Sequence, residues 1–134
     1  MGYYLEDSLK CLEQDPNFDT YGHIDYICRY WPYEDKNLHY SEHADLWDEV
    51  MKHLIRLDKS IEINTRRLAV PGAVESLTEL YTRYAELGGK YVTLGSDAHA
   101  AKAVGMHFDV AQKIAKTAGL TIVYYKKRQR QLPK

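Results

Sequence analysis

The sequence lacks several of the patterns that define whole classes of protein. It contains no apolar run long enough to cross a bilayer and no signal-peptide pattern, so we expect no association with a membrane. No GxGxxG fingerprint and no P-loop occur, and nucleotide-binding α/β folds therefore lose support. Only 2 cysteines, Cys11 and Cys28, are present in 134 residues, which is too few for a disulfide scaffold. We expect free thiols and a cytoplasmic location.

A charge excess of one sign is also missing. The net charge of −1 gives no general attraction to nucleic acid or to an anionic membrane. Positive charge gathers only in the last nine residues, at Lys126, Lys127, Arg128, Arg130 and Lys134. A basic tail can contact nucleic acid, but we expect a solvated and frayed terminus here.

Phenylalanine is scarce, with 2 residues against 12 tyrosines and 2 tryptophans. An aromatic core built from tyrosine carries many hydroxyl groups that need hydrogen-bond partners. The length and the 45% hydrophobic content predict one globular domain, or part of one.

Helix and strand signals alternate along the chain. Apolar residues recur at helical spacing in four segments, 3–14, from Ser41 to about Lys59, 73–87 and 108–118. Short β-branched or aromatic runs lie between or after them, at 18–21, 60–64, 91–94 and 120–125. This alternation predicts an α/β fold with a parallel sheet, either a barrel or a layered arrangement.

The stretch from Tyr91 to His99, Tyr-Val-Thr-Leu-Gly-Ser-Asp-Ala-His, organises the rest of the chain. A short buried strand is followed by Gly95, and Asp97 and His99 then stand two residues apart, which places their side chains together in extended backbone. A carboxylate beside an imidazole suits a divalent metal ion. The alternative is that Asp97 caps the next helix and His99 is an ordinary polar loop residue.

Other metal-type side chains follow other predicted strands. His23 comes after the first strand and Asn64 ends the second, and the carboxyl ends of parallel strands are where α/β folds place their chemistry. This clustering favours a metal site at that edge. His39 and His43 are four residues apart, but the sequence around them is polar on every side and indicates an exposed face.

Three motifs carry a family resemblance, and they are Gly22-His23-Ile24-Asp25-Tyr26-Ile27-Cys28-Arg29-Tyr30, Glu62-Ile63-Asn64-Thr65 and Gly95-Ser96-Asp97-Ala98-His99. In this order they resemble successive motifs of the polymerase-and-histidinol-phosphatase (PHP) superfamily, most closely its histidinol-phosphatase branch. The resemblance implies a distorted (β/α)7 barrel that hydrolyses phosphoesters, with a metal cluster at the carboxyl ends of the strands.

The resemblance also implies roles for individual residues. His23, Asp97 and His99 match three of the family's metal ligands, with Zn, Mn or Fe as the metal, and Asp97 and His99 are the candidate catalytic residues. Arg29 resembles a residue that faces the substrate phosphate. Many relatives continue Asn-Thr with Ser-Gly-Leu-Arg, whereas this chain has Arg66-Arg67-Leu68-Ala69. We favour Arg67 as the second phosphate-binding residue, and a surface role is the alternative.

The family opens with a His-x-His motif, and this chain has none. Residues 1–134 therefore resemble the carboxyl-terminal portion of the barrel domain, with the amino-terminal half absent. Four strands cannot close a seven-strand barrel, and we expect an open edge with an apolar interior face that favours a two-fold dimer. A single, weakly held ion per chain is the most that three matched ligands predict.

Three functional hypotheses follow. The first is a metal-dependent phosphoesterase that hydrolyses a small phosphomonoester such as histidinol phosphate through a metal-activated water. The second is a non-catalytic fragment that folds by self-association. The third is a nucleic-acid-processing relative, which the charge of −1 disfavours because such a protein needs a basic groove or stacking aromatics.

Overall fold

The computed structural model describes residues 1–133. Its α-helices are α1 (Gly2–Gln14), α2 (Ala44–Arg56), α3 (Ala73–Glu86) and α4 (Phe108–Ala118). Short 3-10 segments cover Tyr26–Tyr30, Tyr40–His43 and Ala101–Ala103. The strands are β1 (Thr20–Tyr21), β2 (Ser60–Asn64), β3 (Tyr91–Gly95), β4 (Thr121–Ile122), β5 (Tyr124–Lys126) and β6 (Gln129–Gln131).

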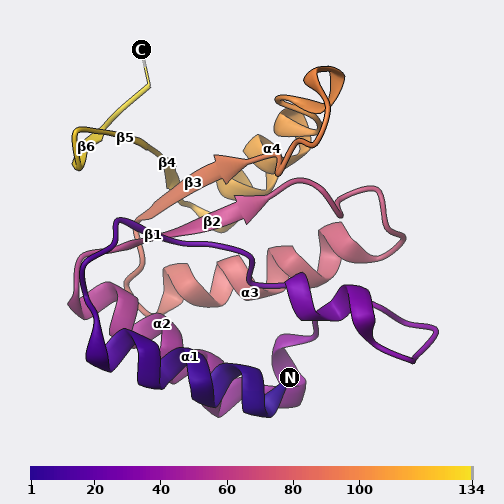
Figure 1. Cartoon of the computed structure of the whole chain (residues 1–134), viewed down its shortest axis with the longest axis horizontal. Helices are drawn as coiled ribbons and strands as arrows, with labels where there is room; N and C mark the ends of the chain where they lie inside the picture. The colour runs from indigo at the N-terminus through magenta and orange to yellow at the C-terminus, as the bar shows by residue number, and fades with distance from the viewer. Residues whose placement is uncertain (134) are drawn as a thin grey trace.

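Strands β1 to β4 form one parallel sheet in sequence order (Figure 1). Each connection from β1 onward passes through a helix, as parallel pairing requires, because a strand must return to its starting end before it can pair again. The predicted α/β class, with alternating strands and helices, is confirmed. The glycines expected to end two helices do so, since Gly88 and Gly119 have φ angles of 108° and 77°.

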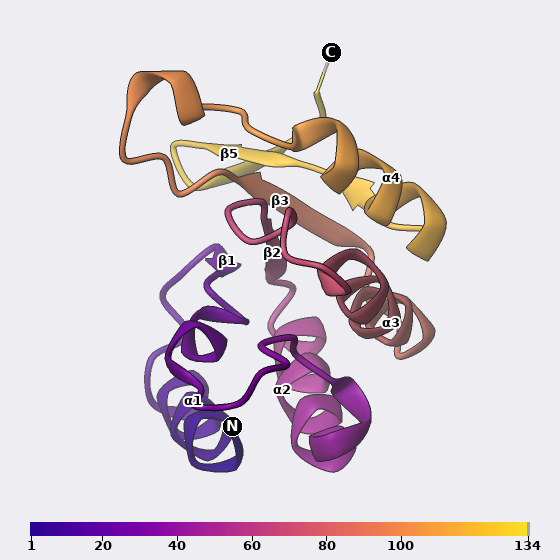
Figure 2. The ribbon, with the colours of Figure 1, turned by 90° about the vertical axis from the view of Figure 1, so that its right-hand side faces the viewer.

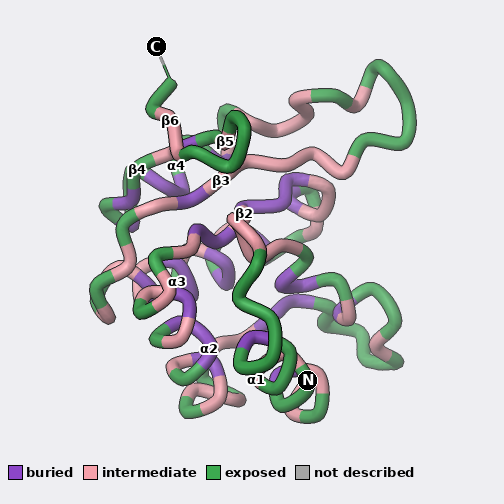
Figure 3. Tube along the Cα trace, turned by 60° about the vertical axis from the view of Figure 1, so that its left-hand side comes forward, coloured by how far each residue is buried: buried purple, intermediate pink, exposed green. Residues whose placement is uncertain are grey.

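The helices lie in an arc along one side of the curved sheet (Figure 2). The core fills the space between helices and sheet, where Figure 3 shows buried stretches of α2, α3 and β2. Ile61, Ile63 and Val92 are fully buried there. Alternation along the strands turns their neighbours to the opposite face.

That opposite face is polar. The hydroxyls of Thr20 and Thr93 meet at 2.8 Å across β2, which also shows how strongly the sheet curves. Glu62 lies on the same face as Thr93, its register partner. The expected apolar interior face is therefore wrong for β2 and β3, because their apolar residues Ile61, Ile63 and Val92 lie in the core on the side of the helices.

Residues 124–131 of the basic tail form a hairpin, which corrects the expectation of a frayed terminus for them, whereas Lys134 lies outside the described residues. The predicted strand 120–125 divides into β4 and β5, and β5 pairs with β6 in an antiparallel hairpin. Lys127 and Arg128 turn the hairpin with φ angles of 50° and 64°. Arg128 pairs with Asp19 at 3.2 Å and Arg130 pairs with Asp58 at 3.0 Å. No helix among residues 1–133 is long and apolar enough to cross a membrane.

Candidate active site at the carboxyl edge of the sheet

The predicted site residues gather at one edge of the sheet, the edge that faces the viewer in Figure 2. His23 lies two residues beyond β1, Arg67 three residues beyond β2, and Asp97 and His99 follow β3. Neighbouring loops are tied together, because the Thr65 amide donates to the Gly95 carbonyl at 2.8 Å. The register of three parallel strands thus places these loops side by side.

Two of these residues adopt a backbone conformation that few side chains occupy. The φ angles of His23 and Asp97 are 57° and 48°, in the left-handed region. Such a residue bends the chain sharply and changes the direction of its side chain at the end of a strand. Strained backbone of this kind is concentrated at functional sites because the surrounding structure must hold it in place.

A small cleft brings most of the predicted residues together. Its volume is about 10 Å³, which leaves room for about one water molecule. It is lined by His23, Asp25, Tyr26, Arg29, Asn64, Arg66, Arg67 and Asp97. Four of the five predicted site residues line this carboxyl-edge cleft, and His99 approaches it through Arg66.

Arg66 occupies the space between Asp97 and His99. Its Nη1 donates to the Asp97 carbonyl at 2.9 Å, lies 3.4 Å from Asp97 Oδ2 and contacts His99 Nδ1. The backbone of the loop at Arg66 is fixed by a hydrogen bond, since the Arg66 N–H donates to Asn64 Oδ1 at 3.0 Å. The sequence pattern favoured the next residue, Arg67, and did not identify Arg66 as a neighbour of Asp97 and His99, the pair of candidate metal ligands.

The fit of a metal ion can be tested on these contacts. Oxygen and imidazole donors of suitable kinds are present, but a guanidinium lies where an ion bridging Asp97 and His99 would lie. Within residues 1–133, no three His, Cys, Asp or Glu side chains come close enough together to hold a metal ion. The described residues, arranged as they are, do not complete a metal site.

Arg67 makes a buried ion pair. Its Nη1 lies 3.2 Å from Asp25 Oδ2 and its Nη2 donates to the Lys36 carbonyl at 2.5 Å. The two paired side chains are only 11% and 9% exposed. Burial raises the pKa of Asp25, and the Arg67 guanidinium opposes that shift. A phosphate bound by Arg67 would have to share a guanidinium that already donates to three oxygen atoms, two of Asp25 and one of Lys36.

Arg29 is more available to a ligand than Arg67. Its guanidinium lies 5.7 Å from the ring centres of both Tyr26 and Tyr30. The two tyrosine hydroxyls are 3.0 Å apart, and Tyr26 also packs edge-on against His23. The 3-10 segment after His23 thus brings a cation and an exposed aromatic ring, Arg29 and Tyr26, to the lining of the cleft.

Glu62 belongs to the site and was not among the predicted residues. Its Oε1 accepts from Asn64 Nδ2 at 3.1 Å and from the His23 amide at 3.4 Å. A Cβ atom at Gly95 would clash with Glu62 Oε2, so the glycine that ends β3 leaves room for this carboxylate. The signal was in the sequence: Glu62 alternates with Ile61 and Ile63, which places it on the face away from the helices.

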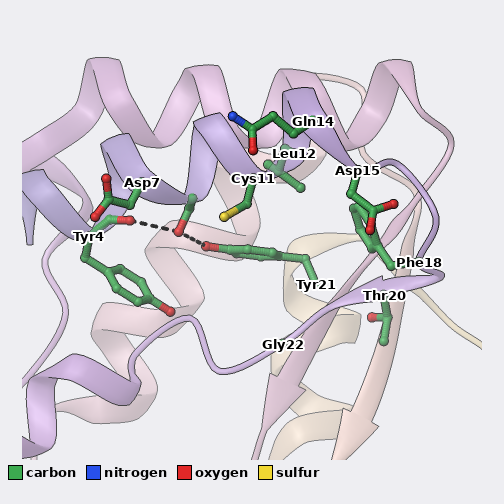
Figure 4. Close-up of a pocket in the computed structure, with 11 residues that line it drawn as sticks. Tyr4, Asp7, Cys11, Leu12, Gln14, Asp15, Phe18, Thr20, Tyr21 and Gly22 are labelled. Carbon is green, nitrogen blue, oxygen red and sulfur yellow. Dashed lines mark hydrogen bonds between the residues drawn. The ribbon is translucent and has the colours of Figure 1, made fainter.

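A larger groove lies beside the open edge of the sheet, between α1 and β1 (Figure 4). Its volume is about 610 Å³ and its walls include Tyr4, Cys11, Leu12, Phe18 and Tyr21. The Tyr21 hydroxyl donates to Ser8 Oγ at 3.0 Å and fixes the strand to the helix. The outer side of β1 has no neighbouring strand in the described sheet.

Comparison with curated proteins finds histidinol-phosphatases. The chain is 42% identical over 125 residues to a probable histidinol-phosphatase of Clostridium acetobutylicum, covering 93% of this chain and 49% of that protein. It is 34% identical over 116 residues to the histidinol-phosphatase of Lactococcus lactis, covering 87% of this chain and 43% of that protein. The chain thus spans about half the length of these relatives. No protein-family model matches the sequence.

Comparison with solved structures gives the same result. The fold is similar to that of histidinol phosphate phosphatase from Lactococcus lactis, a crystal structure with zinc, L-histidinol and phosphate. The TM-score is 0.89 at 31% identity, and the match covers 96% of this chain and 49% of that one. The predicted likeness to histidinol phosphatases is confirmed, and the α/β fold described above corresponds to half of a larger one.

Proposed function

We propose that this chain supplies part of the active site of a metal-dependent phosphoesterase that acts on a small phosphomonoester such as histidinol phosphate. One observation carries the proposal: a chain 42% identical to about half of a probable histidinol-phosphatase gathers His23, Arg29, Arg67 and Asp97 around one cleft. The solved relative holds zinc, histidinol and phosphate.

The roles follow from the chemistry of each side chain. Arg29, which is exposed, would bind the phosphate oxygens, and the more buried Arg67 would add positive charge, since guanidinium groups match phosphate geometry. His23, Asp97 and His99 would be donors for Zn, Mn or Fe, and the metal would supply a water that ionises near neutral pH. Asp97 would also handle the proton of the leaving oxygen.

We further propose that residues 1–134 form the carboxyl-terminal portion of the barrel domain, and that the groove between α1 and β1 receives the remaining half. Three features support this arrangement: the unpaired outer side of β1, the volume of about 610 Å³ beside it, and relatives about twice as long. The missing metal donors would enter with that half. The chain alone is then inactive.

The decisive experiment is complementation. The chain is expressed alone and together with the half of the Clostridium acetobutylicum relative that it does not cover, and phosphate release from histidinol phosphate is measured with Zn or Mn. We expect the pair to exceed either half alone by at least about a hundredfold, because electrostatic groups at a reacting centre contribute that much. Replacing Asp97 with Ala in the pair should remove the gain.

Sedimentation of the same samples tests how the groove is covered. A 1:1 complex that forms and yet releases no phosphate would contradict the proposed activity. The two-fold dimer predicted from sequence would instead appear as self-association of the chain that the added half does not disrupt. In that case the remnant hypothesis, a folded fragment without catalysis, would account better for the protein.

A further inference from the structure

We infer that Arg66 is an internal cation that competes with a divalent metal ion for Asp97 and His99. The inference rests on the proposed function, because it assigns those two residues as metal donors. It goes beyond that function by explaining why the described residues form no metal site, and by naming the residue that must move before an ion can bind.

The geometry of Arg66 carries the inference. One atom, Nη1, reaches the Asp97 carbonyl at 2.9 Å, Asp97 Oδ2 at 3.4 Å and the Nδ1 atom of His99. The Nδ1 atom of His99 also lies 2.8 Å from the Asp97 carbonyl oxygen. A guanidinium nitrogen can only donate, so in the tautomer whose Nδ1 carries no proton this nitrogen accepts from Arg66, and its lone pair is not free for a metal ion. The Asp97 carboxylate is neutralised by the same group.

A metal ion cannot share this position with the Arg66 guanidinium. A guanidinium and a divalent cation only a few ångströms apart repel each other strongly in a partly buried site, where water screens their charges poorly. Binding of metal therefore requires Arg66 to leave. Its side chain is 32% exposed, so the guanidinium can turn outward without disturbing the core.

Two other arginines, Arg29 and Arg67, line the same cleft as Arg66. The backbone at Arg66 is held in place, because its N–H donates to Asn64 Oδ1. The Asn64 side chain is held in turn, since its Nδ2 donates to Glu62 Oε1. Only the side chain has to move.

The test is zinc affinity, measured by competition with a chromophoric chelator on the full chain. Arg66→Ser should bind zinc at least about tenfold more tightly than the native chain, the scale on which groups surrounding a metal's ligands change its affinity. Arg66→Lys should stay within about threefold of the native value, because an ammonium group retains the competing charge.

Arg29→Ser is the matched control. It removes the same charge from the same cleft, but Arg29 contacts Tyr26 and Tyr30 rather than the metal-type pair. We expect less than about a threefold change, because Arg29 is exposed, and solvent weakens the effect of an exposed charge that does not contact the ligands. Adding Asp97→Asn to the Arg66→Ser chain should abolish the gained affinity, and urea denaturation confirms that each variant is folded.

Three results would overturn the inference. Equal affinity, or equal absence of binding, in the native and Arg66→Ser chains would mean that Arg66 does not compete. An equal gain in zinc affinity in Arg29→Ser would mean that the loss of any positive charge from the cleft has the same effect. A gain that survives Asp97→Asn would place the zinc elsewhere. None of these depends on phosphate release, so failure here is distinct from failure of the complementation experiment.

Discussion

Replacing Arg67 with Met should lower the free energy of unfolding by about 3–4 kcal/mol at pH 7. The Arg67 and Asp25 side chains are almost fully buried, and removal of one partner from such a pair leaves an uncompensated charge. The loss has an upper limit, because Asp25 can instead take up a proton. An aspartic acid has an ordinary pKa of about 3.9 in water, so its protonation at pH 7 costs about 4 kcal/mol.

The pH dependence of this loss has a definite sign. Burial already raises the pKa of Asp25, and removing Arg67 raises it further, so the folded variant binds a proton that the unfolded chain releases. Stability of the variant relative to the native chain therefore increases as the pH falls from 7 toward 5. The gain is about 1.4 kcal/mol for each pH unit while protonation limits the loss.

Urea denaturation at pH 7 and pH 5 measures both effects. Arg128→Met is the matched control, since Arg128 pairs with Asp19 at 3.2 Å but is 54% exposed, and an exposed pair contributes about 0–1 kcal/mol. The double variant Asp25→Asn with Arg67→Met should recover most of the stability, because no unpaired charge remains. Equal losses in the two arginine variants would contradict the assignment of Arg67 as a buried structural charge.

The location of the site was predictable from sequence, because the carboxyl ends of parallel strands must meet at one edge. The placement of His23, Asp97 and His99 beyond β1 and β3 follows from that rule alone. The local backbone was not predictable. Positive φ angles are uncommon outside glycine, and although Asp and His adopt them more often than most residues, nothing in the motifs indicates that His23 and Asp97 do so here.

The choice between Arg66 and Arg67 shows where sequence reasoning ends. Both arginines follow the same strand, and one residue of offset decides which reaches Asp97 and which turns back to Asp25. That offset is set by a turn in which Asn64 Oδ1 accepts the Arg66 amide. The motif alone does not reveal which arginine faces Asp97, since the directions of the two side chains depend on the conformation of this turn.

The hairpin at the carboxyl end was missed for a related reason. Its turn residues, Lys127 and Arg128, both have positive φ without glycine or asparagine, so the usual hairpin signal is absent. Long-range pairs supply what the turn lacks. Arg128 reaches Asp19, and Arg130 reaches Asp58 and covers the Tyr91 ring at 4.0 Å.

The tyrosine-rich core, by contrast, was visible in the composition, and it predicts unfolding in alkali. Burial raises the pKa of Tyr21, of Tyr81 and of Tyr84, the last to about 12. Above pH 10 the unfolded chain loses phenolic protons that the folded chain keeps. Stability therefore falls as the pH rises, because the folded state binds more protons than the unfolded state.

The size of the effect can be set for Tyr84. A rise in pKa from 10.0 to about 12 corresponds to about 2.7 kcal/mol of stability lost between pH 10 and pH 12. Tyr21 and Tyr81 act in the same direction, and so does Cys28, whose pKa burial raises to about 11. Because domains are stable by only about 5–15 kcal/mol, we expect cooperative unfolding before pH 12.

The variant Tyr84→Phe isolates one contribution. At pH 7 it should lose only about 1 kcal/mol, since the Tyr84 hydroxyl donates a 3.3 Å hydrogen bond to the Lys59 carbonyl. Between pH 10 and pH 12 its stability should fall less steeply than that of the native chain, by about 2.7 kcal/mol in total. Tyr3→Phe, at a site 87% exposed, serves as the control for losing a tyrosine. Parallel curves for the native chain and Tyr84→Phe would mean that the buried phenol does not titrate with unfolding, and alkaline sensitivity would then have to arise from other groups.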